Sequence, residues 1–208
     1  MKALDALNKT DDIASSQRGY VTSAQTLAVG VGRMELSRLA ARGHLERVGR
    51  GVYRAAGAPS IREEEVWCAW LSLEPAVLAY ERDPLTHVVS RNTATWLMDL
   101  GELNPEPVTF TSAVRRQVKR DGLRIVRGRL VASEVHTVAG LPCTTAARTV
   151  YDLVADGEDL SLISSVLHDA LSAGIIYDEA SLQRDFDGLG KRLGLAGGMS
   201  LYEMLMRG

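Results

Sequence analysis

The order of helix starts, stops and turns in the first third of the chain limits its fold more than any other feature. Apolar residues at helical spacing predict a first helix over residues 3–15. Thr22-Ser-Ala-Gln25 then matches a capping box, in which the threonine and glutamine side chains satisfy backbone groups at a helix start. Gly30 and Gly32 bracket a turn that ends this short helix, and a third helix is expected over residues 32–42. The pattern therefore predicts two helices joined by a tight turn and preceded by a longer helix.

A β-hairpin is expected directly after these helices. Gly43 is well placed to end the third helix in a left-handed conformation. The glycine-rich turn Gly49-Arg50-Gly51 is bracketed by Leu45 and Val48 on one side and by Val52 and Tyr53 on the other. Helix, short helix, turn, helix and hairpin follow one another in the order of a winged helix-turn-helix. We therefore predict such a domain over residues 1–57.

The formal net charge of −2 conceals an uneven distribution of charge along the chain. From Arg18 to Arg54, seven arginines are opposed by two glutamates, which gives a local charge of +5. From Arg115 to Arg129, seven basic residues are opposed by one aspartate, which gives +6. The rest of the chain therefore carries −13. Two basic segments within an acidic body indicate an anionic partner for at least one part of the chain.

The third helix and the hairpin present the residues that we expect to contact double-stranded DNA. If Leu36, Leu39 and Ala40 are buried, several polar side chains of the same helix point outward. The second helix of a helix-turn-helix lies in the major groove, where arginine can read guanine, and basic side chains at the hairpin suit phosphates or the minor groove. The candidate DNA-binding residues are Arg33, Ser37, Arg38, Arg42, Arg47, Arg50 and Arg54.

Residues 60–208 are expected to form a second, mixed α/β domain, which places the whole chain in the α+β class. Residues 57–59 are interpreted as a linker, and Ser60-Ile-Arg-Glu63 as a second capping box that opens a helix. Ser90 is expected to cap a further helix. Runs of β-branched residues predict strands at residues 108–111, 123–126 and 135–138. Cap residues predict helices at residues 145–153 and 160–171.

Several classes of function find no support in the residues. The apolar runs are shorter than a membrane span, and the first residues lack the apolar core of a secretory signal, so a cytoplasmic protein is expected. Cys68 and Cys143 lie apart in apolar surroundings, and the histidines are scattered, which offers no set of metal ligands. We expect no metal and no cofactor.

Three motifs resemble the AbiEi-type antitoxins of type IV toxin–antitoxin systems. They are the segments Gly43–Arg54 (GHLERVGRGVYR), Ser90–Trp96 (SRNTATW) and Gly140–Leu153 (GLPCTTAARTVYDL). The resemblance spans most of residues 18–175, and the length of the chain is similar to that of the shorter, mycobacterial-like members. It implies a repressor that binds its own operator through the N-terminal domain and neutralises a nucleotidyltransferase toxin through the C-terminal domain. An acidic body would complement a basic toxin.

Two features of the second domain have more than one interpretation. Arg148 and Asp152, inside the third motif, are one helical turn apart and are expected to form a structural ion pair rather than a catalytic one. The basic stretch Arg115–Arg129 could be a second DNA contact, a toxin contact or a solvated hairpin. We favour the hairpin.

Two other functions remain open beside the binding antitoxin. The chain could inactivate the toxin as an enzyme, an atypical serine/threonine kinase, or it could be a plain transcriptional regulator whose second domain senses a ligand. The sequence has no GxxxxGK[ST] motif, and Gly188–Gly194 lacks the serine or threonine that would hold magnesium. No catalytic residue is therefore assigned.

Overall fold

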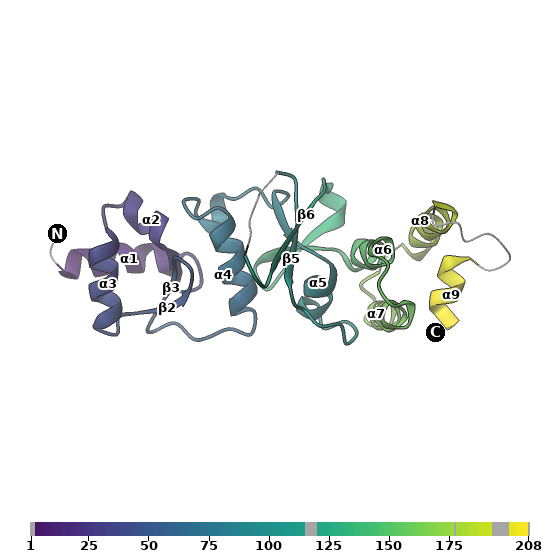
Figure 1. The fold of residues 1–208 in the computed structure, drawn as a ribbon, viewed down its shortest axis with the longest axis horizontal. Helices are drawn as coiled ribbons and strands as arrows, with labels where there is room; N and C mark the ends of the chain where they lie inside the picture. Colours follow the sequence, from purple (N-terminus) through teal and green to yellow (C-terminus); the bar gives the residue numbers. More distant parts are fainter. Residues whose placement is uncertain (1–2, 115–119, 177, 193–199, 208) are drawn as a thin grey trace. The chain divides into compact units, whose positions relative to one another are not determined.

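The fold is described from a computed structural model, which describes residues 3–114, 120–176, 178–192 and 200–207. The chain divides into two compact units, Met1–Asp83 and Pro84–Gly208, and each mixes helices with strands (Figure 1). The protein is therefore of the α+β class, as the sequence predicts. None of the helices within the described ranges is long and apolar enough to cross a membrane.

The first unit consists of a small antiparallel sheet and several helices. Its elements are α1 (Ala3–Ser15), β1 (Tyr20–Thr22), α2 (Ser23–Ala28), α3 (Arg33–Ala41), β2 (Leu45–Gly49), β3 (Val52–Ala55), α4 (Glu64–Leu73) and the 3-10 helix η1 (Ala79–Glu81). The strand order in the sheet is β1-β3-β2, and both pairs of strands are antiparallel. The helices and the hairpin that the sequence predicts are all present. Strand β1 was not expected.

The local signals in the sequence act as predicted in this unit. The Thr22 hydroxyl accepts a hydrogen bond from the Gln25 backbone N–H (3.1 Å), and the Gln25 side chain accepts one from the Thr22 backbone N–H (2.9 Å). Gly43, which follows α3, has a φ of 75°. Leu36 and Leu39 of α3 are buried in one cluster with Leu45 of β2, so packing against α1 and the hairpin holds α3 in place.

Helix α4 belongs to the first unit, although the sequence placed a domain boundary at residues 57–60. The Arg18 guanidinium donates to the Glu63 carboxylate (2.8 Å), and the Tyr20 hydroxyl donates to the Glu64 carboxylate (2.8 Å). These contacts and the packing of α4 on the sheet extend the unit to Asp83. The expected capping box of Ser60 and Glu63 is wrong, because Glu63 itself is the N-cap residue and has no side-chain capping bond.

The second unit consists of a five-stranded mixed sheet and a group of helices. Its elements are β4 (His87–Val89), α5 (Arg91–Leu97), β5 (Val108–Ser112), β6 (Leu123–Arg127), η2 (Ala132–Glu134), β7 (Val135–Val138), β8 (Leu141–Thr144), α6 (Ala146–Asp156), α7 (Leu160–Ser172), α8 (Glu179–Arg192) and α9 (Leu201–Arg207). The strand order is β6-β5-β4-β8-β7. Helices α6 to α9 pack on one another around a shared apolar core that includes Leu153, Ile163, Leu167 and Phe186 (Figure 1).

The strands on either side of the second basic stretch do not form the expected hairpin. Strands β5 and β6 pair in parallel, with Val108 opposite Leu123 and Ser112 opposite Arg127. A hairpin joins antiparallel strands, so the hairpin prediction for Arg115–Arg129 is wrong. Arg115, Arg116 and Lys119 lie outside the described residues. Strands β4 and β8, of three and four residues, were also missed.

Candidate nucleic-acid interface

Helix α3 exposes several polar side chains on the side away from the core. Leu36 and Leu39 are 1% and 3% exposed, whereas Ser37 and Arg38 between them are exposed. This alternation follows from the helical repeat of 3.6 residues, which places Ser37 and Arg38 on the side opposite to the two leucines. Arg33, at the first position of the helix, and Arg42, just after its last residue, are also exposed. Four of the predicted DNA-binding residues therefore lie on or beside one accessible surface.

The hairpin of β2 and β3 adds two further exposed arginines. Arg47 lies in β2, and Arg50 lies at the tip between the strands. The tip can turn sharply because Gly51 has a φ of 72°, a conformation that L-residues with a Cβ avoid. The Ser23 backbone N–H donates to the Gly51 carbonyl (2.8 Å), which ties the hairpin tip to the start of α2. The hairpin therefore carries its basic side chains on a turn fixed to the helices.

Arg54 differs from the other predicted DNA-binding residues. Its guanidinium is bound to the carboxylates of Glu46 (2.5 Å) and Glu64 (2.6 Å), and its side chain is only 13% exposed. Glu64 also accepts the Tyr20 hydroxyl, and burial together with this bond raises the pKa of Tyr20 to about 12. Arg54 thus connects β3 to α4, and its charge is neutralised within the unit.

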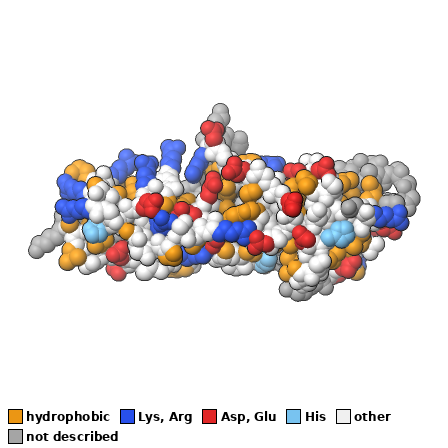
Figure 2. Space-filling model, turned by 90° about the horizontal axis from the view of Figure 1, so that it is seen from below, with side chains coloured by type: hydrophobic (Ala, Val, Ile, Leu, Met, Phe, Trp, Pro, Cys, Tyr) orange, Lys and Arg blue, Asp and Glu red, His pale blue; other side chains and the backbone are white. Residues whose placement is uncertain are grey.

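Basic side chains are visible together on the surface of the first unit. Figure 2 shows Lys and Arg side chains gathered over its N-terminal elements. Met34, an apolar residue with 64% of its surface exposed, directly follows Arg33 on α3. The sequence analysis overlooked Met34, although its place two residues before Leu36 marks it as outward-facing.

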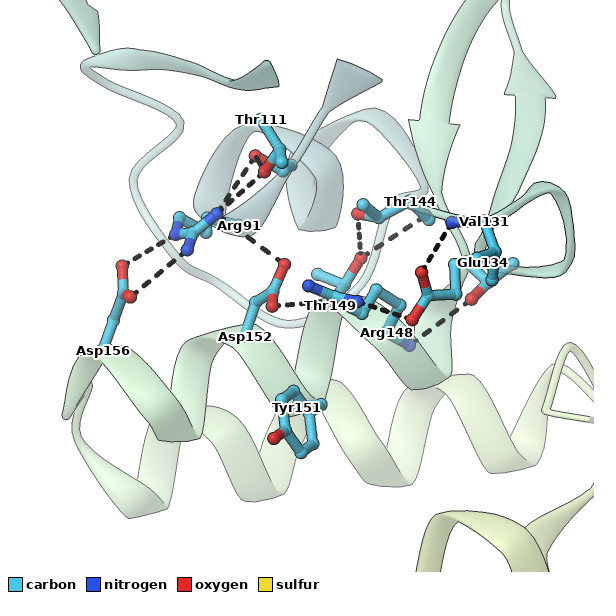
Figure 3. A network of polar contacts seen from close by, with 12 residues as sticks. Arg91, Thr111, Val131, Glu134, Thr144, Arg148, Thr149, Tyr151, Asp152 and Asp156 are labelled. Carbon is cyan, nitrogen blue, oxygen red and sulfur yellow. Dashed lines mark hydrogen bonds and ion pairs between the residues drawn. The ribbon is translucent and has the colours of Figure 1, made fainter. Parts of the chain in front are cut away.

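The second unit contains a network of arginines and carboxylates centred on α6 (Figure 3). Arg91, at the start of α5, donates to both carboxylate oxygens of Asp156 (2.7 and 3.3 Å) and to the Thr111 hydroxyl (3.0 Å). Arg124 of β6 donates to the same Asp156 carboxylate (2.9 Å). Arg91 is only 7% exposed, so its charge depends on these partners.

The predicted pair of Arg148 and Asp152 is part of this network. Arg148 donates to Asp152 (2.9 Å) and to Glu134 of η2 (2.5 Å), while the second oxygen of Asp152 lies 3.7 Å from the Arg91 guanidinium. The network thus joins α6 to α5, β6 and η2. Each arginine in it has a carboxylate partner, which is the pattern expected of a structural ion-pair network rather than a phosphate site.

The pKa values of the two aspartates of α6 are shifted in opposite directions. Burial raises the pKa of Asp152 above its ordinary value, although Arg148 and Arg91 oppose the shift. Burial also acts to raise the pKa of Asp156, but the bonds and charges of Arg91 and Arg124 outweigh it and lower that pKa. The sequence analysis missed Arg91 and Asp156. The signal for Asp156 was its place one helical turn after Asp152 on the same helix face.

Other kinds of site are not evident in the part of the chain that the structure describes. Cys68 and Cys143 are buried, and burial raises the pKa of the Cys143 thiol well above its ordinary value. No three His, Cys, Asp or Glu side chains among the described residues come together as a group that could hold a metal ion.

Comparison with known proteins addresses the first unit. Residues 8–56 match the family model described as "Transcriptional regulator, AbiEi antitoxin". The match includes the motif Gly43–Arg54, whereas the motifs Ser90–Trp96 and Gly140–Leu153 lie outside it. A search of curated proteins finds none that matches the chain. The N-terminal region of the chain therefore matches the AbiEi antitoxin family of transcriptional regulators, the family that its sequence motifs resemble, and this match supports an antitoxin or regulator role.

Proposed function

We propose that the chain is the antitoxin of a bacterial type IV toxin–antitoxin pair and that it represses its own operon. In this proposal the first unit is a winged helix-turn-helix, with α3 as the recognition helix and the β2–β3 hairpin as the wing. The observation that carries the proposal is the exposed basic surface on α3 and the hairpin, which coincides with the part of the chain that matches the family. The protein would act in the cytoplasm, where the operator DNA is.

The proposed surface divides its contacts between bases and phosphates. Arg33, Ser37, Arg38 and Arg42 would enter the major groove from α3, where base edges carry the sequence information. Arg47 and Arg50 on the wing would contact phosphates or the minor groove. Arg54 is left out, because both of its carboxylate partners would have to release it first.

A pair of arginine variants tests this division. We expect Arg38→Ala to weaken binding to the operator by about 5- to 150-fold, because a bidentate contact to guanine contributes about 1–3 kcal/mol of discrimination. Binding to unrelated duplexes should fall much less. We expect Arg50→Ala to weaken binding to all sequences and to reduce the slope of log K against log salt by about one unit. The measurement is fluorescence anisotropy with the DNA upstream of the gene and a shuffled duplex, at several salt concentrations.

The matched control for these variants is Arg184→Ala, which removes an exposed arginine from α8 in the second unit. It should bind both duplexes as the unchanged protein does. Wild-type affinity for the operator in both Arg38→Ala and Arg50→Ala would contradict the proposed surface.

The second unit is proposed to bind a nucleotidyltransferase toxin. This part of the proposal rests on the family resemblance, because the motifs Ser90–Trp96 and Gly140–Leu153 both lie in this unit. The test is to mix the purified chain with the product of the neighbouring gene, ATP and Mg²⁺. A stable complex with an unchanged toxin mass supports neutralisation by binding. A phosphate added to the toxin only when this chain is present would replace binding with an enzymatic mechanism.

A further inference from the structure

One apolar side chain lies at the centre of the surface of α3 that is proposed to enter the major groove. Successive residues of an α-helix are rotated by about 100°, which places Met34 almost directly opposite the midpoint between Leu36 and Leu39. The two leucines are buried, and Met34 is 64% exposed. Ser37 and Arg38, one turn further along α3, flank it on either side of the same face. Met34 is therefore the most outward-facing residue in the first turn of α3.

Met34 also lies at the end of α3 that contacts bases in a helix-turn-helix. In a helix-turn-helix the N-terminal residues of the recognition helix reach the base edges, and Met34 is the second residue of α3. A methionine side chain is long and unbranched, so it can adapt its shape to an apolar group at the floor of the groove.

The major groove presents one apolar group in its base-pair code, the C5-methyl group of thymine. We propose that Met34 reads a thymine in the operator by packing against this methyl group. The inference rests on the proposed function, since it assumes that α3 lies in the major groove.

The spacing of side chains on α3 also relates this thymine to a second base. Met34 and Arg38 are four residues apart on one face, about 6 Å along the helix axis. Base pairs are stacked about 3.4 Å apart, so the two side chains reach bases within about two base pairs of each other. The operator should therefore contain a thymine within about two base pairs of the guanine that Arg38 contacts.

The test removes the methyl group from the DNA instead of relying on a protein variant alone. Footprinting on the DNA upstream of the gene defines the bound site, and a synthetic duplex of that site is titrated by fluorescence anisotropy. Each thymine is then replaced singly by deoxyuridine, which lacks only the C5-methyl group. For the unchanged protein we expect a three- to five-fold loss of affinity when the thymine that Met34 contacts is replaced, the size expected for one buried methyl group.

Protein variants then assign the effect to Met34. Met34→Ala should bind the thymine duplex three- to five-fold more weakly than the unchanged protein and should bind the thymine and deoxyuridine duplexes equally. Met34→Leu should retain part of the discrimination, because leucine keeps an apolar side chain at this position. The matched control is Leu4→Ala on α1, which removes another apolar side chain of similar exposure, 69%, and should retain the full discrimination.

The possible failures are distinguishable. If the protein binds the site but no deoxyuridine substitution weakens binding, the inference about Met34 is wrong and the DNA-binding function stands. The same holds if Met34→Ala still distinguishes thymine from deoxyuridine, which would assign the methyl contact to another residue. If the unchanged protein binds no duplex at low salt, the proposed function fails and the inference about Met34 fails with it.

Discussion

Replacing Arg82 with alanine is expected to lower the free energy of unfolding of the first unit by about 3–5 kcal/mol. The Arg82 guanidinium donates to the carbonyls of Trp70 (2.6 Å), Leu71 (2.9 Å) and Glu74 (2.7 Å) at the end of α4. It also stacks on the Trp70 ring, 4.3 Å from the ring centroid. Arg82 is only 8% exposed, so its loss would leave carbonyl groups at a helix C-terminus without these partners.

The expected loss can be measured by hydrogen exchange with mass spectrometry on the full chain, on peptides from α4 and from β1 to β3. Arg82→Lys is an informative second variant, because it keeps the charge but loses the planar fork that reaches several carbonyls at once. It should be nearly as unstable as Arg82→Ala. The control is Arg42→Ala, an exposed arginine just after α3, which should change exchange in α4 little. Unchanged protection of α4 in Arg82→Ala would show that these bonds contribute little.

Asp156→Ala is expected to lower the free energy of unfolding of the second unit by about 1–3 kcal/mol, because it removes the carboxylate that binds the buried Arg91 in a part-buried ion pair. Arg91, with its side chain 9% exposed, would lose both bonds to Asp156 and would keep the Thr111 hydroxyl and the more distant carboxylate of Asp152, at 3.7 Å. Arg124 would lose its bond as well, but its side chain is 50% exposed, so water can replace much of that interaction. Urea denaturation, followed by exchange on peptides from α5 and α6, measures the effect.

The dependence of stability on pH provides a second test of this prediction. The pKa of Asp156 is lowered in the folded state, so the ionised carboxylate stabilises the folded protein at a pH above the unfolded pKa of about 3.9. This contribution is lost as the pH falls below that value and through the lower folded pKa. The difference in stability between the unchanged protein and Asp156→Asn should therefore shrink below about pH 4. The control, Asp185→Asn at an exposed position of α8, should show little difference at any pH. A difference that did not change with pH would contradict the ion-pair explanation.

The local structure of the first unit could be predicted from its sequence because short-range interactions specify it. The capping box of Thr22 and Gln25, the left-handed Gly43 and the turn at Gly51 each involve residues close together in the chain. The same reasoning failed at Ser60. Glu63 is bound by Arg18, a residue far away in the sequence, and helix α4 begins one residue after it. The Glu63 carboxylate is therefore held by a partner that the capping motif does not contain.

In the candidate site too, local spacing made some side-chain positions predictable, whereas distant contacts decided others. The exposure of Ser37 and Arg38 follows from helical spacing and the burial of the leucines, so their position was predictable. The burial of Arg54 was not predictable, because it depends on two carboxylates that only the folded structure places beside the Arg54 guanidinium. Glu46 comes from the neighbouring strand and Glu64 from α4. The exposure of Met34 could have been predicted from the same helical spacing, but only its polar neighbours were considered.

The second unit shows most clearly what the sequence alone did not determine. The sequence located strands β5, β6 and β7 and the ion pair of Arg148 and Asp152, because these depend on β propensity and on i, i+4 spacing. The parallel pairing of β5 with β6 and the binding of Arg91 to Asp156 join segments that are distant in the chain. Such contacts form only when the whole sheet and α6 are assembled. By itself the sequence determined the helices, turns and charged faces, whereas the tertiary structure decided which charges remain exposed to a partner and which are neutralised inside the protein.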